Sequence, residues 1–247
     1  MATALSGKAA LVTGGSRGIG AAIAKRLARD GAAVAITYTK GKEPADAVVR
    51  EIVAAGGLAI AIQADAADAT AVQRAVDEAA TKFGRLDVLV NNAGIAPDGA
   101  FDEMSLETFD RLIGVNIKGV MVATQSASKR MTAGGRVIMI GSCLGERVPF
   151  GGVTAYSMTK APVAGLIRGM AREYGPRGIT VNNVQPGPID TEMNPAEGPN
   201  AAGARGLTAL GRYGHVDDIA SMVAYLAGPE SQYVTGANIL VDGGANA

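Results

Sequence analysis

Tyr156 and Lys160 are four positions apart, so a helix through this region would place both side chains on one face. A phenol with its unperturbed pKa of about 10 is poorly matched to proton transfer at neutral pH unless a positive neighbour stabilises the phenolate. A lysine one helical turn away supplies that charge. The pair is therefore suited to donating a proton to a carbonyl oxygen while another group delivers hydride to the carbon.

A glycine-rich turn at residues 13–20 follows an apolar run and precedes a helical pattern. Glycine lets the main chain approach a pyrophosphate closely, and the free amides at a helix N-terminus bind its charge. The spacing Thr-Gly-x-x-x-Gly-x-Gly differs from the common Gly-x-Gly-x-x-Gly dinucleotide pattern, so the segment taken alone also fits a tight turn without a ligand. The cofactor contacts predicted here are Gly14, Ser16, Arg17, Gly18, Ile19 and Gly20.

Seven short apolar runs alternate with helical stripes along the 247 residues. This alternation predicts a Rossmann-like, doubly wound α/β fold, in which a seven-stranded parallel sheet carries helices on both faces. We expect one catalytic domain over residues 1–247, and a substrate loop at about 190–211, where prolines and glycines break the rhythm. The predicted strands cover residues 9–13, 33–38, 58–62, 86–90, 136–140, 179–184 and 238–241.

Further motifs follow the glycine turn in a fixed order: Asn91-Asn92-Ala93-Gly94, Asn116, Ser142, Tyr156-x-x-x-Lys160 and Pro186-Gly187. Over essentially the whole chain this order resembles the short-chain dehydrogenase/reductase family, most strongly its 3-oxoacyl-carrier-protein reductases. Residues 182–191 are also similar to a branch described as binding cyclic di-GMP in biofilm dispersal.

The resemblance implies an NAD(P)-dependent oxidoreductase that interconverts ketones and secondary alcohols, often as a homotetramer. Tyr156 would be the general acid, and Lys160 would lower its pKa and hold the nicotinamide ribose. Ser142 would bind the substrate oxygen, while Asn116, within a helix expected over 105–131, would fix a water linking Lys160 to solvent. The alternative is a protein that only binds a nucleotide messenger such as cyclic di-GMP in the same cleft, but the intact catalytic set favours turnover.

The end of the second strand favours NADPH over NADH. An acid there would bind the ribose 2′-hydroxyl of NAD and repel a 2′-phosphate. Tyr38, Thr39 and Lys40 occupy this region instead, and the guanidinium of Arg17 is suited to binding a phosphate. An ordinary solvated loop charge is the alternative interpretation of Lys40.

The resemblance implies further contacts around both ligands. Asp65 and Ala66 would flank the adenine, although Asp65 is also interpretable as the N-terminal residue of a helix. The remaining cofactor contacts would be Asn91, Ala93, Gly94, Pro186, Gly187, Ile189 and Thr191. A mostly apolar substrate site predicts a hydrophobic or mixed carbonyl compound, in contact with Ser142, Cys143, Leu144, Phe150 and Met193.

Composition excludes several other classes of protein. Lys plus Arg and Asp plus Glu both number 23, so no net field favours nucleic acid or anionic lipid. The sequence lacks the ~20 consecutive apolar residues of a membrane span and the pattern of a signal peptide, which predicts a soluble, cytoplasmic protein. One cysteine and one histidine argue against a metal site built from these residues.

Three isolated residues have local interpretations. Pro162 lies just after Lys160 and predicts a kink or an early-turn position, because it cannot donate the helical hydrogen bond to Met158. His215 begins a helical stripe, which favours a capping or surface role. Cys143 has no obvious base beside it, so we expect a pocket wall and not a nucleophile.

Overall fold

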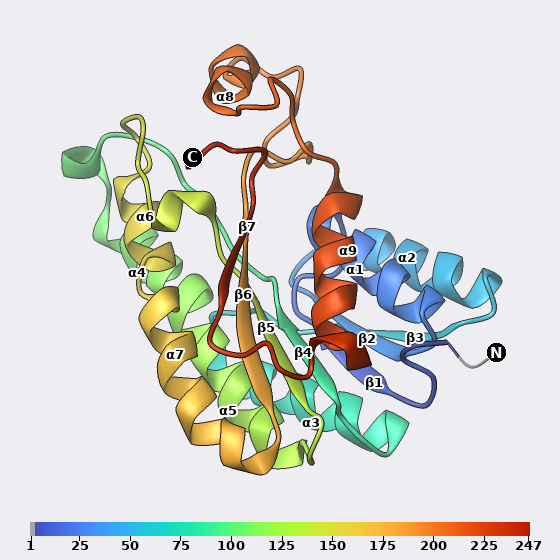
Figure 1. The fold of residues 1–247 in the computed structure, drawn as a ribbon. Coiled ribbons are helices and arrows are strands. Elements are labelled where there is room, and N and C mark those ends of the chain that lie inside the picture. Colours follow the sequence, from blue (N-terminus) through green and yellow to red (C-terminus); the bar gives the residue numbers. More distant parts are fainter. Residues whose placement is uncertain (1–2) are drawn as a thin grey trace.

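The computed structural model describes residues 3–247, which form a seven-stranded parallel sheet in the order β3-β2-β1-β4-β5-β6-β7 (Figure 1). The predicted fold class is confirmed. Because the strand order reverses between β1 and β4, a crevice opens at the carboxyl ends of these strands. The strands are β1 Ala9–Val12, β2 Ala33–Tyr38, β3 Leu58–Gln63, β4 Val88–Asn91, β5 Arg136–Ile140, β6 Thr180–Pro186 and β7 Asn238–Val241.

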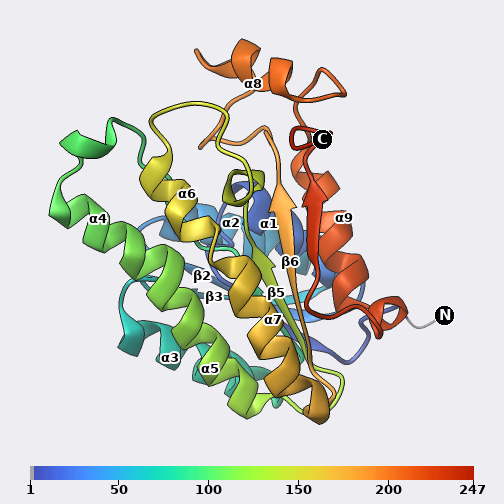
Figure 2. The same ribbon diagram turned by 60° about the vertical axis from the view of Figure 1, so that its left-hand side comes forward.

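Helices cover both faces of the sheet (Figures 1 and 2). One face carries α1 Gly18–Arg29, α2 Lys42–Ala54 and α9 Val216–Ala227, and the other carries α3 Ala69–Phe83, α5 Val120–Arg130 and α7 Val163–Tyr174. Shorter helices are α4 Leu106–Ile113, α6 Thr154–Lys160 and α8 Ala201–Leu207. Single turns occur at η1 Phe101–Glu103, η3 Cys143–Gly145, η4 Gly175–Arg177 and η5 Pro229–Ser231.

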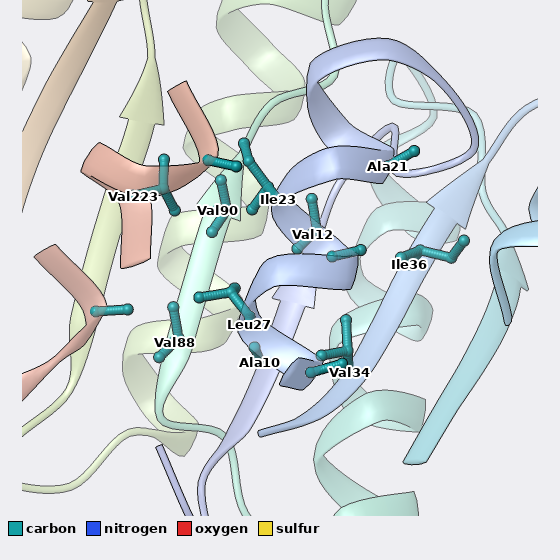
Figure 3. Close-up of a cluster of buried hydrophobic side chains, with 14 of the residues drawn as sticks. Ala10, Val12, Ala21, Ile23, Leu27, Val34, Ile36, Val88, Val90 and Val223 are labelled. Atoms are coloured by element: carbon teal, nitrogen blue, oxygen red, sulfur yellow. The ribbon is translucent and has the colours of Figure 1, made fainter. Parts of the chain in front are cut away.

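Strand alternation divides the core into two layers. Ala10 and Val12 of β1 pack towards α1 and α9, whereas Leu11 between them packs towards α3 and α5. Figure 3 shows the first layer, where Ile23 and Leu27 of α1 point onto the sheet. Both are fully buried, which confirms the helical stripe predicted from the sequence and fixes α1 against the strand that precedes it.

The helix expected over 105–131 is continuous but changes its winding in the middle. Between α4 and α5, a π-helical segment, η2, spans Gly114–Gly119. Gly114 and Gly119 lie against the backbone and Cβ atoms of Ala66 and Ala67, where a side chain would collide. The two glycines therefore let the loop after β3 pack closely against η2, and π-segments of this kind often occur at functional sites.

Pro162 and His215 behave as predicted. The helix that carries Tyr156 ends at Lys160, and Pro162, with φ −66° and ψ −18°, precedes the first residue of α7. His215 is the N-cap of α9, where its Nδ1 accepts from the amide of Asp217 at 3.3 Å.

Residues 190–211 were expected as an irregular loop, and this expectation was wrong in part. The segment contains α8, which stands apart from the sheet above its carboxyl edge (Figure 1). Its short stripe of alanines and glycines gave no apolar periodicity from which to predict it. Across residues 3–247, no helix combines the length and apolarity needed to cross a membrane.

Candidate active site

A cleft of about 1320 Å³ runs along the carboxyl ends of the central strands. Pockets for one small ligand usually measure roughly 300–1,000 Å³, so this larger cleft has room for a dinucleotide and a second molecule. All predicted site residues line it except Asn91 and Asn116, which lie behind its wall.

The glycine turn forms one end of the cleft. Gly14 has φ +65°, and its amide donates to the hydroxyl of Thr37 at 3.0 Å. The side-chain amide of Asn92 donates to the carbonyls of Thr13 and Gly14, both at 2.9 Å, and so ties the turn to β4. A Cβ at Gly20 would lie 2.5 Å from Nδ2 of Asn92, so only glycine fits there.

The start of α1 is suited to a phosphate group. Its N-cap, Arg17, makes no side-chain cap, so the first amides of the helix have no partner within the helix and border the cleft. The residues present therefore fit the pyrophosphate of a dinucleotide. Neither Arg17 nor Lys40, both exposed, forms an ion pair within the described chain, which leaves two cations at this end.

Asp65 also borders this end of the cleft, and it does not cap a helix. Asp68 is the N-cap of α3 and accepts from the amides of Thr70 and Ala71, so the alternative interpretation of Asp65 was wrong. Burial alone would raise the pKa of Asp65, but the Arg111 guanidinium at 2.9 Å and the Ala67 amide at 2.9 Å outweigh it and lower the pKa. The carboxylate is therefore held ionised beside the cleft.

Asn91 corrects the expected set of cofactor contacts. Its side chain turns into the core, where Nδ2 donates to the hydroxyl of Thr124 at 2.9 Å and contacts the sulfur of Met139 at 3.3 Å. Successive residues of a strand face opposite ways, so Asn92 turns towards the glycine turn instead. The sequence motif contained Asn92, but family likeness alone did not distinguish the roles of the two amides.

Tyr156, Lys160 and Ser142 meet in the middle of the cleft. Tyr156 and Lys160 come from one face of α6, and the Lys160 Nζ lies 5.6 Å from the centre of the Tyr156 ring. Lys160 is buried and donates to the carbonyl of Ile140 at 2.9 Å. Ile140 is the last residue of β5, and Ser142 follows it. The end of this strand therefore contacts Lys160 through the Ile140 carbonyl and Tyr156 through the Ser142 hydroxyl.

The electrostatics of this trio differ from the expectation that Lys160 lowers the pKa of Tyr156. Burial raises the pKa of Tyr156 to about 12, against a smaller lowering effect of the Ser142 hydroxyl. Burial also lowers the pKa of Lys160 to about 8. The phenol is therefore held in its proton-bearing form at neutral pH, and the ammonium group is close to releasing its own proton.

Asn116 lies behind the cleft wall in η2, and all of its side-chain amide is engaged. Its Oδ1 accepts from the amide of Ile95, and its Nδ2 donates to the carbonyl of Ile95, both at 2.9 Å. Nδ2 also donates to the hydroxyl of Thr159 at 3.0 Å. Gly94 separates this amide from the cleft, because a Cβ there would lie 3.5 Å from Asn116 Oδ1 and 3.7 Å from Lys160 Nζ.

The other end of the cleft is mostly apolar. Leu144, Phe150 and Met193 line it, and the last two are 47% and 61% exposed. Burial, followed by the charge of Asp242, raises the pKa of Cys143 to about 11, so its thiol stays protonated at neutral pH. No signal in the sequence indicated Ala245 and Asn246, which also line this wall.

Among residues 3–247, no three His, Cys, Asp or Glu side chains group into a metal site.

Comparison with known proteins agrees with this geometry. A family model described as enoyl-(acyl carrier protein) reductase matches residues 14–246. The cyclic-di-GMP-binding biofilm dispersal mediator protein of Escherichia coli is 45% identical over 240 residues, 97% of this chain and 98% of that protein. The 3-oxoacyl-[acyl-carrier-protein] reductase of Synechocystis is 43% identical over 245 residues, 98% of each chain.

A solved structure is similar throughout. The crystal structure of a short chain dehydrogenase from Burkholderia cenocepacia in complex with NADP has a TM-score of 0.98 and 54% identity, and the match covers 99% of this chain and 100% of that one. The fold, the cleft and these relatives together establish that the chain belongs to the short-chain dehydrogenase/reductase family of NAD(P)-dependent oxidoreductases.

Proposed function

We propose that this oxidoreductase is an NADPH-dependent carbonyl reductase, which reduces a ketone to a secondary alcohol and acts as an alcohol dehydrogenase in reverse. One observation carries the proposal. Tyr156, Lys160 and Ser142 border the same cleft as the uncapped amides of α1, so one cleft holds both a group able to donate a proton and a helix N-terminus suited to a pyrophosphate.

Each catalytic residue has a role that suits its surroundings. The nicotinamide supplies hydride to the carbonyl carbon when it is bound. The Ser142 hydroxyl holds the carbonyl oxygen, and Tyr156, whose pKa of about 12 keeps its proton in place, donates that proton to the oxygen. Lys160 holds the ribose and stabilises the resulting phenolate, while Asn116 fixes Ile95 and η2 behind them.

The preference for NADPH rests on charge. Arg17 and Lys40 border the cleft, and no acid lies at the end of β2. A 2′-phosphate would bind these cations, whereas the 2′-hydroxyl of NADH gains nothing from them. The similar Burkholderia structure is described as a complex with NADP, which supports this choice.

The remaining contacts follow from the order of residues along the cleft. We assign the adenine to Asp65 and Ala66, and the nicotinamide side to Ala93, Gly94, Pro186, Gly187, Ile189 and Thr191. The substrate would contact Ser142, Cys143, Leu144, Phe150 and Met193, with residues 190–211 as the loop that covers it. The whole chain would act as one catalytic domain.

An absorbance assay tests the reaction and the cofactor together. NADPH or NADH is supplied at equal concentration, and the absorbance of the reduced nicotinamide is followed with ketones, β-ketoesters, quinones and an enoyl thioester. We expect oxidation of NADPH with ketones or β-ketoesters, at a higher kcat/KM than for NADH. Reduction of the enoyl thioester alone would assign the protein to alkene reduction, and no turnover with any compound would contradict the proposal.

A binding protein for a nucleotide messenger is the second candidate. The Escherichia coli relative described as cyclic-di-GMP-binding, at 45% identity, is the observation that favours it. Calorimetric titration with cyclic di-GMP, with NADPH as a competitor, distinguishes the two. Tight competitive binding without reduction of any carbonyl compound would favour this second function.

We also propose that the active form is a homotetramer, as is common in the family. Tyr225, Tyr233 and Leu240 are exposed around β7, the last strand of the sheet, and a second copy would cover them. Light scattering coupled to size exclusion at micromolar concentration measures the mass, and a monomer would contradict the assignment.

A further inference from the structure

The segment that follows β7, Asp242 to Asn246, folds back across the substrate end of the cleft. The Asp242 carboxylate accepts from the amide of Gly244 at 2.9 Å and from the amide of Asn246 at 3.0 Å, which turns the chain. Gly187 packs directly on this turn, since a Cβ there would lie 2.5 Å from the Asp242 Cα. The segment therefore starts from a fixed point beside the carboxyl end of β6.

Two hydrogen bonds join this segment to the turn that follows β5. The Asn246 side-chain amide donates to the carbonyl of Cys143 at 2.8 Å, and the Arg147 guanidinium donates back to the carbonyl of Ala245 at 2.9 Å. We call this reciprocal pair the clasp. Ala245 is buried and, with Asn246, lines the cleft, so the clasp closes the pocket wall beside the reacting groups.

The clasp adjoins Ser142, the residue proposed to hold the carbonyl oxygen of the substrate. Cys143 directly follows Ser142, whose hydroxyl accepts from the amide of Leu144 at 3.1 Å. The Cys143 carbonyl also accepts from the amides of Glu146 and Arg147, at 3.0 and 3.2 Å, so the bond from Asn246 converges on the centre of the turn. Without that bond, the turn would keep the bond from Arg147 to Ala245 and the packing of Gly145 on Lys160, but the centre of the turn would lose its tie to residues 242–246.

We propose that Asn246 is a positioning residue for Ser142, and that the clasp between residues 242–246 and the turn at 142–147 sets the position of the hydroxyl against the substrate. The inference rests on the proposed carbonyl reductase activity for its kinetic consequence. Its structural consequence, a loosened turn after β5, is independent of the reaction.

The kinetic test compares Asn246→Ala with Gln125→Ala, an exposed residue of α5 outside the cleft. One hydrogen bond contributes a net ~0.5–1.5 kcal/mol, so we expect kcat for ketone reduction to fall about two- to tenfold in Asn246→Ala. The KM for NADPH should stay unchanged, because neither hydrogen bond of the clasp involves a residue assigned to the cofactor. Gln125→Ala should match the wild type in both parameters.

The structural test uses Cys143, the single cysteine of the chain, as a reporter. Cys143 is only 7% exposed at the wall of the cleft, so alkylation by iodoacetamide should be slow while the turn is held and faster when the turn opens. We expect alkylation, followed by mass spectrometry, to be at least about threefold faster in Asn246→Ala than in the wild type or Gln125→Ala. Arg147→Met removes the other bond and should accelerate alkylation in the same direction, even if Asn246→Ala folds poorly.

The outcomes separate the two hypotheses. A wild type that reduces no carbonyl compound would contradict the proposed function, while faster alkylation in both variants would still support the clasp. Unchanged alkylation in a folded Asn246→Ala or Arg147→Met protein would overturn the clasp, whatever the activity. Faster alkylation with an unchanged kcat would overturn the link to Ser142.

Discussion

Thr159 tests how α6, the helix that carries Tyr156 and Lys160, is held in position. Its hydroxyl accepts from Asn116 Nδ2 at 3.0 Å and donates to the carbonyl of Tyr156 at 2.7 Å. The side chain is 1% exposed and connects the π-segment η2 to the helix that carries Tyr156 and Lys160. Thr159→Val keeps the shape of the side chain and removes both bonds.

The size of the effect follows from the bond that Asn116 loses. A buried donor left without a partner costs about 1–3 kcal/mol, and Asn116 would keep only its bonds to Ile95. If the whole cost falls on the transition state, kcat for ketone reduction drops about 5- to 150-fold. Thr159→Ser retains the hydroxyl and should stay close to the wild type.

Steady-state kinetics with saturating NADPH measure kcat for both variants, and thermal unfolding monitored by circular dichroism checks their stability. We expect a large loss of kcat in Thr159→Val and a kcat close to that of the wild type in Thr159→Ser. Wild-type kcat in a folded Thr159→Val protein would show that the link between Asn116 and the catalytic helix has no part in the reaction.

Three other perturbations test separate parts of the structure. Gly20→Ala would place a Cβ 2.5 Å from Asn92 Nδ2 and should abolish binding of NADPH, measured by its fluorescence, whereas retained binding would refute the cradle at the glycine turn. Ketone reduction should decline as the pH rises through about 8, because burial lowers the pKa of Lys160 to about 8 and the neutral amine no longer stabilises a phenolate; a flat profile up to pH ~10 would contradict this role. Burial alone would raise the pKa of Asp87, but Arg85 at 2.6 Å, the Ala9 amide at 2.9 Å and Lys8 at 3.2 Å outweigh it, so the pKa is lowered. Asp87→Asn should therefore reduce the free energy of unfolding by about 1–3 kcal/mol at neutral pH. The lowered pKa of Asp87 stabilises the folded state at pH values above the unfolded pKa of about 4. Urea titrations should therefore show the difference in unfolding free energy between the wild type and Asp87→Asn vanish as the pH falls through the lower folded pKa. A difference that stays constant with pH would be inconsistent with this role of Asp87.

Periodicity was sufficient to predict the sheet and its helices. Val12, Leu11 and Ala10 pack into alternate core layers, and because both faces of the sheet are covered this strand is a continuous apolar run in the sequence. Periodicity failed for α8, whose alanines and glycines carry no apolar stripe, and for η2, whose π-helical winding no spacing of apolar residues indicates.

The candidate site was predictable where adjacent residues of one element supply it, as Tyr156 and Lys160 do. It was less predictable where the outcome depends on packing between distant segments. The sequence could not show that Asn91 faces the core while Asn92 binds the turn, nor that Asn246 reaches Cys143. The pKa of Tyr156 is also a property of burial, which no spacing of residues reveals.

The central claim is that Tyr156 donates the proton in the cleft that binds NADPH. The most direct measurement compares the wild type with Tyr156→Phe, in the binding of NADPH by fluorescence and in the single-turnover rate of ketone reduction. We expect Tyr156→Phe to bind NADPH with an affinity close to that of the wild type and to reduce the ketone at least about a hundredfold more slowly. An undiminished rate in Tyr156→Phe would contradict it.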